Sequence, residues 1–307
     1  MRATSDRLTY CKLAAVTMIW GGTFVAGRYL ANQVDPLLAA SLRFLLASLA
    51  LLLFMGVARI PLVRPSLQQL ALLAVLGFFG IFFYNLCFFY GLHYINASRA
   101  SLIVALNPAV IGLASWLLFK ERSGRSKVMG IALCLGGAAT VIVSRNPQLM
   151  QVAPQSWLGD LLIFGCVLAW GVYSLFSRGL NATLGPLQTV TWSVLLGTLM
   201  LTATTALSGG ITLEAVARID LPQLLSLVYL GVLGSALAYI GYYDGLRRIG
   251  ATRSGVFIAL NPLTAVICGA LLLGEQLTVP MLLGGAVILL GIYLCNKPLA
   301  RARVMGI

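Results

Sequence analysis

Ten long apolar stretches follow one another along the chain, separated by short clusters of charged residues, prolines and other polar residues. Each is close to the roughly 20 residues that a helix needs to cross the hydrocarbon core of a bilayer. Because lipid offers the backbone no hydrogen-bonding partner, and because strict alternation of apolar and polar residues is absent, all ten are predicted to be membrane-spanning helices. The predicted spans are residues 10–30, 36–56, 67–92, 96–119, 126–144, 157–179, 185–207, 222–246, 252–273 and 279–296.

The composition agrees with lipid as the main solvent of this chain. Hydrophobic residues make up 60% of the 307 residues and charged residues only 9%, whereas a soluble domain has about 25% charged residues. The six cysteines lie in or beside the apolar stretches without a Cys-x-x-Cys pair, and His93 is the only histidine. We therefore predict an all-α integral membrane protein without a disulfide framework, metal site or cofactor. The sequence has no phosphate-binding glycine loop and no Ser/His/Asp set, so it is not predicted to be an enzyme.

The basic residues are distributed unevenly between the two ends of the predicted spans. The net charge is +13, and sixteen of the 21 Lys and Arg residues fall on the side that carries both termini. Four fall on the opposite side, and Arg43 lies inside a span. Since Lys and Arg accumulate in cytoplasmic loops of membrane proteins, both termini are predicted to be cytoplasmic. This distribution explains the net charge without a nucleic acid partner.

The second half of the sequence repeats features of the first half. The Trp-Gly pair at Trp20 occurs again at Trp170, and the Ala-Leu-Asn-Pro motif that begins at Ala105 occurs again from Ala259. Five spans in each half would place the second half in the membrane with opposite polarity, and such inverted repeats are typical of transporters. The predicted repeats are residues 1–148 and 149–307.

Only two of the eleven prolines fall in the middle of predicted spans, Pro108 and Pro262. A proline inside a helix has no N–H to donate and leaves the carbonyl four residues earlier free. Each of the two follows an asparagine, Asn107 or Asn261, whose amide adds further donors and acceptors. We predict a pair of kinked helices that line a substrate cavity, and the alternative is a kink that serves packing alone.

Two tryptophans, Trp20 and Trp170, lie ten or more residues inside their predicted spans. Most tryptophans of membrane proteins lie instead at the membrane surface. Trp170 is followed at the i+3 position by Tyr173, and these two side chains share one helix face. All three residues are predicted to bind an apolar substrate with a polar group, with a packing role as the alternative for Trp20.

Two further spans, residues 67–92 and 222–246, carry polar aromatic residues. A buried tyrosine hydroxyl needs a hydrogen-bonding partner, so a tyrosine that faces lipid is disfavoured. We predict that Tyr84 and Tyr239 face the cavity and that Asn85 contributes an amide to the same substrate site.

The middle of the predicted spans contains no acidic residue. All eight lie at termini, in loops or at span ends, and Asp244 is the one that could lie deeper. Because proton-coupled carriers generally use an acid within the membrane, we expect facilitated transport here. Arg43 is the single basic residue well inside a span and is predicted to snorkel to the membrane surface. The alternatives for Arg43 are contact with a carbonyl or with a substrate carboxylate.

The repeated Ala-Leu-Asn-Pro motif, the glutamates thirteen residues after each proline (Glu121 and Glu275) and the Trp-Gly pairs resemble the drug/metabolite transporter superfamily. They resemble in particular its EamA-type branch, and within it the bacterial exporters of aromatic and other neutral amino acids. The resemblance implies ten helices in two inverted repeats, a central cavity and a bacterial inner membrane location. It also implies that Tyr84, Asn107 and Trp170 line the cavity.

The expected function is therefore export of small neutral or zwitterionic metabolites, most of all amino acids, by alternating access through a central cavity. Asn107 and Asn261 stand where some relatives of the resembled family have a bulkier ring, which points to a different preferred substrate. An efflux carrier for neutral drugs or nucleosides is one alternative. A membrane enzyme or accessory subunit that acts on lipid is the other.

Overall fold

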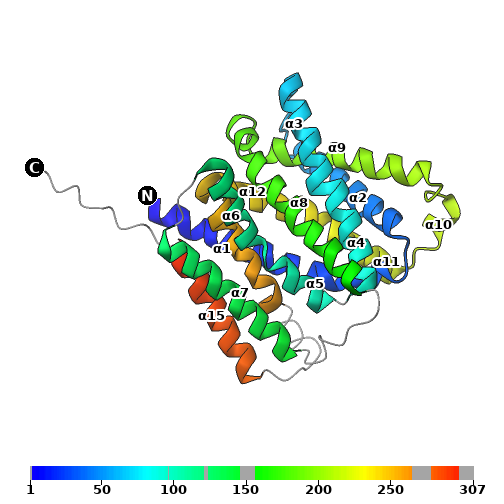
Figure 1. The fold of residues 1–307 in the computed structure, drawn as a ribbon. Helices are drawn as coiled ribbons and strands as arrows, with labels where there is room; N and C mark the ends of the chain where they lie inside the picture. Colours follow the sequence, from blue (N-terminus) through cyan, green and yellow to red (C-terminus); the bar gives the residue numbers. More distant parts are fainter. Residues whose placement is uncertain (1, 96, 121–123, 146–155, 265–277, 297–307) are drawn as a thin grey trace, which may run out of the picture.

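The computed structural model describes residues 2–95, 97–120, 124–145, 156–264 and 278–296, and all regular secondary structure within these ranges is helical (Figure 1). The helices of the first half are α1 (Arg2–Ala31), α2 (Pro36–Val57), α3 (Leu67–Gly77), the π-helical segment η1 (Phe78–Phe83), α4 (Tyr84–Tyr94), α5 (Ala97–Val104), α6 (Asn107–Phe119) and α7 (Arg125–Arg145). Those of the second half are α8 (Ser156–Thr183), α9 (Pro186–Leu207), α10 (Leu213–Ala217), α11 (Leu221–Val228), the π-helical segment η3 (Tyr229–Leu237), α12 (Ala238–Ile249), α13 (Ala251–Gly255), the 3-10 segment η4 (Val256–Leu260) and α15 (Val279–Asn296).

Seven helices of the described part are long and apolar enough to cross a membrane, and they correspond to seven of the ten predicted spans. Two more predicted spans coincide with α7 and α15 to within one residue at either end. The remaining one, 252–273, begins with α13 and η4 and continues into residues 265–277, which lie outside the described residues. The described part of the chain is therefore all-helical, with the long apolar helices of a membrane protein, and the ten-span count remains a prediction.

Several helices begin where local side-chain chemistry satisfies the free backbone N–H groups of the first turn. Asp35 accepts hydrogen bonds from two backbone N–H groups of α2, and Pro36 occupies the first position of that helix, where no N–H is needed. Ser66 and Asp220 form capping boxes at the starts of α3 and α11. These contacts explain why Asp35 and Asp220 lie at helix ends and not within the spans.

The main helix packing joins the two halves of the sequence. α1 packs against α12, α4 against α8, α2 against α9, and α7 against α15. Figure 1 shows α7 and α15 side by side along one side of the molecule. Each pair therefore contains one helix of the predicted repeat 1–148 and one helix of the predicted repeat 149–307.

Glycines allow α7 and α15 to touch backbone to backbone. A Cβ added at Gly130 would lie 2.6 Å from the carbonyl oxygen of Gly291, and one at Gly137 would lie 2.7 Å from the carbonyl oxygen of Gly284. A Cβ added at Gly284 would lie 2.9 Å from the carbonyl oxygen of Gly137, and one at Gly291 would lie 2.7 Å from that of Gly130. Small residues at such positions let membrane helices approach closely enough for dispersion to hold them together.

The chain breaks its helical pattern at both mid-span prolines. Before Pro108, α5 ends and α6 begins after a short turn, and the side-chain amide of Asn107 donates to the carbonyl of Val104 at 2.9 Å. Before Pro262 the backbone tightens into η4, and the N–H of Asn261 donates to the carbonyl of Ile258. The carbonyls that the prolines leave free thus receive another donor each.

Candidate functional site

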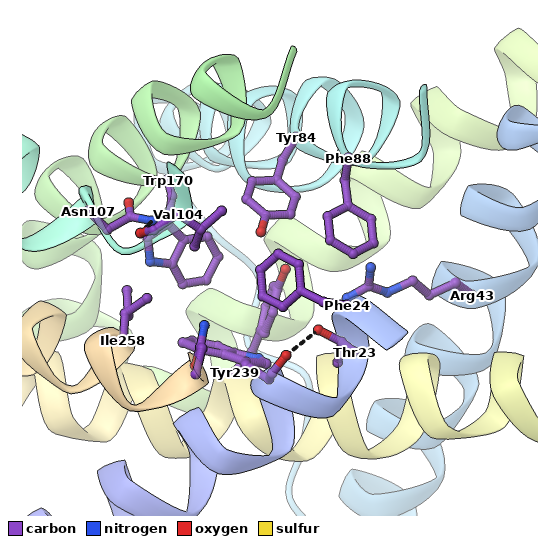
Figure 2. A pocket seen from close by; sticks show the side chains of 12 residues that line it. Thr23, Phe24, Arg43, Tyr84, Phe88, Val104, Asn107, Trp170, Tyr239 and Ile258 are labelled. Atoms are coloured by element: carbon purple, nitrogen blue, oxygen red, sulfur yellow. Dashed lines mark hydrogen bonds between the residues drawn. The ribbon is translucent and has the colours of Figure 1, made fainter. Parts of the chain in front are cut away.

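The helix breaks border a narrow cavity of about 30 Å3 in the middle of the helix assembly. Small-molecule sites are mostly apolar with a few placed polar groups, and the lining of this cavity has that composition. Figure 2 shows the side chains around it, with Asn107 and Arg43 on opposite sides. The cavity is lined by Trp20, Thr23, Phe24, Arg43, Tyr84, Phe88, Val104, Asn107, Trp170, Tyr239, Ile258 and Asn261.

Aromatic rings form most of the cavity wall and pack on one another. The ring of Trp170 lies edge-on to Trp20, Tyr239 and Tyr84, with centroid distances of 5.2, 5.4 and 5.8 Å. The indole N–H of Trp20 donates to the carbonyl of Gly234 at 2.9 Å. Edge-to-face contacts hold rings in fixed orientations, so the wall presents ring faces and edges at defined places.

Two π-helical segments bring Tyr84 and Tyr239 to the cavity. η1 ends immediately before Tyr84, and η3 ends two residues before Tyr239. A π-helical segment shifts the rotational phase of the helix that follows it, and such segments are frequent at functional sites. Both segments also contain a glycine in close contact with a neighbouring helix: a Cβ at Gly80 would overlap the ring of Tyr173, and one at Gly234 would lie 2.7 Å from the methyl group of Thr23.

Two amide oxygens in the cavity lining have no hydrogen-bond partner among the described residues. These are Oδ1 of Asn107 and Oδ1 of Asn261, whose side chains are buried. A buried acceptor without a donor costs about 1–3 kcal/mol. A bound molecule with N–H or O–H groups would relieve that cost, which makes the two oxygens candidate substrate contacts.

Six of the eight residues predicted to bind substrate line the cavity, and Asn85 and Tyr173 do not. Asn85 is fully buried, donates to the carbonyl of Ile81 and accepts a hydrogen bond from Arg43. Tyr173 packs behind Trp170 at 5.2 Å between ring centroids, and its hydroxyl contacts Ser193 at 3.1 Å. Both residues support lining residues from behind.

The prediction that Arg43 snorkels to the membrane surface is wrong. Its side chain is only 3% exposed and lines the cavity. The guanidinium donates from Nε to Ser235 Oγ and from Nη1 to Asn85 Oδ1, each at 3.0 Å. These buried partners hold the head group inward, so its charge lies at the cavity.

The other lining residues were not predicted from the sequence, because their residue types are common in membrane helices. Phe24 and Phe88 pack against each other at 5.7 Å between ring centroids, while Thr23, Val104 and Ile258 complete the lining. One signal was available for part of this set. Val104 and Ile258 lie four residues before the two mid-span prolines, where a free carbonyl was expected.

The acidic residues of the described part lie away from the cavity. Asp244 is half-buried and receives hydrogen bonds from Lys12 Nζ at 2.6 Å and from Arg248 Nε at 2.9 Å. Asp160 accepts two hydrogen bonds from Arg99, at 2.7 and 2.5 Å. None of the described residues contributes a carboxylate to the cavity lining. Glu121 and Glu275 lie outside the described residues.

Sequence comparison matches both halves of the chain to one family. The profile of the EamA-like transporter family matches residues 7–143 and, a second time, residues 157–297. An uncharacterized transporter of Archaeoglobus fulgidus is 28% identical to this chain, and the alignment covers 92% of this chain and 96% of the relative. A protein of Salmonella typhimurium named a probable amino-acid metabolite efflux pump is also 28% identical, with 91% of each chain covered.

A solved structure has the same fold. This crystal structure superposes on the present chain with a TM-score of 0.76 at 21% sequence identity, and the alignment covers 96% of this chain and 98% of the other. At that identity the likeness concerns the fold alone. The two family matches together span most of the sequence and fall on its two halves. The chain is a member of the EamA-like transporter family and is a multi-pass membrane transporter.

Proposed function

We propose that this protein exports small neutral or zwitterionic metabolites, with neutral amino acids as its substrates, through the central cavity. The observation that carries the proposal is the cavity lining as the described residues form it: packed aromatic rings with two unpartnered amide oxygens and no carboxylate. The rings suit an apolar side chain, and the amide oxygens suit an N–H donor. The printed name of the Salmonella typhimurium relative, an amino-acid metabolite efflux pump, supports the same class of substrate.

We further propose ten spans in two inverted repeats related by an axis through the cavity. When each helix is replaced by its counterpart in the other repeat, the α1–α12 pair becomes the α8–α4 pair. The α2–α9 and α7–α15 pairs each map onto themselves. Trp20 and Trp170, which occupy equivalent positions, meet edge to face at the cavity. Ser48 and Thr198 are equivalent as well, and their hydroxyl groups lie 2.9 Å apart. Such symmetry supports alternating access, in which one repeat moves against the other around a fixed site.

The transport is proposed to be facilitated, without a coupled proton. Asp244, the acid that could have lain deeper, is held by two basic side chains, Lys12 and Arg248, outside the cavity lining. The clustering of basic residues supports cytoplasmic termini, and a bacterial inner membrane is the proposed location.

Uptake by vesicles that contain only the purified protein tests this function. We expect saturable entry of labelled neutral amino acids, and the same rate with and without a pH gradient. Entry of nucleosides or neutral drugs but of no amino acid would contradict the substrate class. A strong dependence on the pH gradient would contradict facilitated transport.

Removal of either unpartnered amide is expected to weaken substrate binding. Asn261→Ala should raise the KM for amino acid uptake about tenfold, because a hydrogen bond to a charged ammonium contributes roughly 1.5 kcal/mol or more. Asn107→Ala should raise it similarly and also lower stability, since the same side chain donates to the carbonyl of Val104. The control is Asn32→Ala, which removes an exposed amide that donates to the carbonyl of Arg28 in the last turn of α1. Equal KM values for all variants would contradict a role for the amides in binding.

A further inference from the structure

Arg43 is a cationic side chain buried at the cavity, and it has no acidic partner among the residues that the structure describes. The ion pairs among the described residues do not include Arg43. Their cations are Lys12, Arg99, Arg218 and Arg248, which pair with Asp244, Asp160 and Glu214. The partners of Arg43 are instead a neutral hydroxyl and a neutral amide, on Ser235 and Asn85. A buried charge without a counter-charge is strongly unfavourable, and in membrane helices it indicates function.

The guanidinium also retains donors that the described residues do not use. An arginine side chain has five N–H donors in a planar fork, and Arg43 gives two hydrogen bonds. The rings of Phe44 and Phe88 lie 5.2 and 5.6 Å from its central carbon. These rings offer cation–π attraction but accept no further strong hydrogen bond. The remaining donors therefore have capacity for an anionic acceptor in the cavity.

The charge count in the cavity limits what that acceptor can be. Among the described residues, Arg43 is the single Lys or Arg in the lining, and the other polar groups there are neutral. One guanidinium matches one carboxylate, whose two oxygens fit the guanidinium fork. A phosphate dianion would leave a net negative charge in the cavity. The arrangement therefore favours a monoanionic carboxylate.

We propose that Arg43 is the carboxylate-binding residue of the cavity, so that the transported molecule carries a free carboxylate, with Asn85 and Ser235 as positioning residues. This inference rests on the proposed function and narrows it. It places the carboxylate of an amino acid against α2 and excludes neutral drugs and nucleosides as transported molecules. In Figure 2 the guanidinium projects from α2 toward the rings of the cavity, on the side away from Asn107.

The test compares matched ligands on the wild-type protein. Uptake of labelled phenylalanine into vesicles is competed with unlabelled phenylalanine or with phenylalaninamide, which keeps the ring and amine but lacks the carboxylate. We expect the amide to compete at least about tenfold more weakly. Equal competition by the amide, while phenylalanine is transported, would overturn the carboxylate site and leave the proposed function standing.

A second readout keeps the two proposals apart if no amino acid is transported. Thermal unfolding of the purified full chain is measured with 3-phenylpropionate and with 3-phenylpropanamide. Stabilisation by the carboxylate alone supports the site even though the amino acid assignment has failed, and equal effects of the two compounds overturn it.

Variants of Arg43 then assign the effect to this residue. Arg43→Gln should remove the preference for the carboxylate over the amide in either readout, and Arg43→Lys should keep part of it, since charge remains but the fork is lost. Arg99→Gln, which breaks an ion pair with Asp160 outside the cavity lining, is the control and should keep the full preference. A folded Arg43→Gln protein with the wild-type preference would overturn the proposal. If this variant does not fold, the comparison of ligands on the wild type still decides.

Discussion

Trp170→Ala is expected to reduce amino acid uptake at least tenfold. Trp170 is 4% exposed and contacts five aromatic residues at centroid distances from 5.2 to 5.8 Å. Truncation removes one of the two indole rings of the cavity wall and frees its neighbours to reorient. A change of even one ångström in a binding site can lower a rate about a hundredfold.

The stability of each variant must be measured together with its uptake, because truncation of a buried tryptophan costs about 3–5 kcal/mol of folding free energy. Uptake is therefore normalised to the amount of folded carrier found by size-exclusion chromatography and thermal unfolding. Trp170→Phe keeps a ring at the site and should retain more transport than alanine. Trp157→Ala is the matched control, since Trp157 lies near the start of the same helix and is 63% exposed. Equal uptake by the two alanine variants would contradict the placement of the substrate against Trp170.

Gly137→Val is expected to destabilise the protein strongly, whereas the same change at the next residue, Gly136→Val, is not. A Cβ at Gly137 would lie 2.7 Å from the carbonyl oxygen of Gly284 and 2.9 Å from the backbone nitrogen of Ile288. Both contacts are with backbone, so α7 and α15 must separate to admit a side chain. A Cβ at Gly136 meets nothing within 4 Å.

The two valine variants carry the same change in helix propensity, so the difference between their unfolding temperatures reports the packing of α7 on α15. Overpacking costs about 1–3 kcal/mol or more, and we expect Gly137→Val to unfold about 5 °C or more below Gly136→Val. The measurement is thermal unfolding of both purified proteins in the same detergent. Equal unfolding temperatures would contradict the close approach of these helices.

Much of the fold could be predicted from the sequence, because the bilayer imposes a length and a helical backbone on each span. α15 begins and ends at the predicted residues, and the Asp35 cap explains the start of α2. The two Asn-Pro motifs mark the helix breaks because proline removes a backbone donor wherever it stands. Local chemistry of this kind is readable without tertiary contacts.

The parts of the site that could not be predicted depend on contacts between distant residues. Arg43 has its hydrogen-bonding partners 42 and 192 positions away in the sequence, so its inward orientation has no local signal. The π-helical segment before Tyr84 leaves no mark in the apolar pattern either. Asn85, next to Tyr84, has the residue type of a substrate contact, yet its amide holds Arg43 and lies outside the cavity lining.

The central claim is that substrate binds in the cavity between α1, α4, α8 and α12, and photolabelling tests it most directly. A radiolabelled phenylalanine that carries a diazirine on its ring is irradiated with the wild-type protein in vesicles, and the labelled peptides are identified by mass spectrometry. We predict adducts on cavity residues such as Trp20, Tyr84, Trp170 and Tyr239, suppressed by excess unlabelled phenylalanine. Adducts confined to residues outside the cavity lining, or labelling of the cavity that excess phenylalanine does not suppress, would contradict the claim.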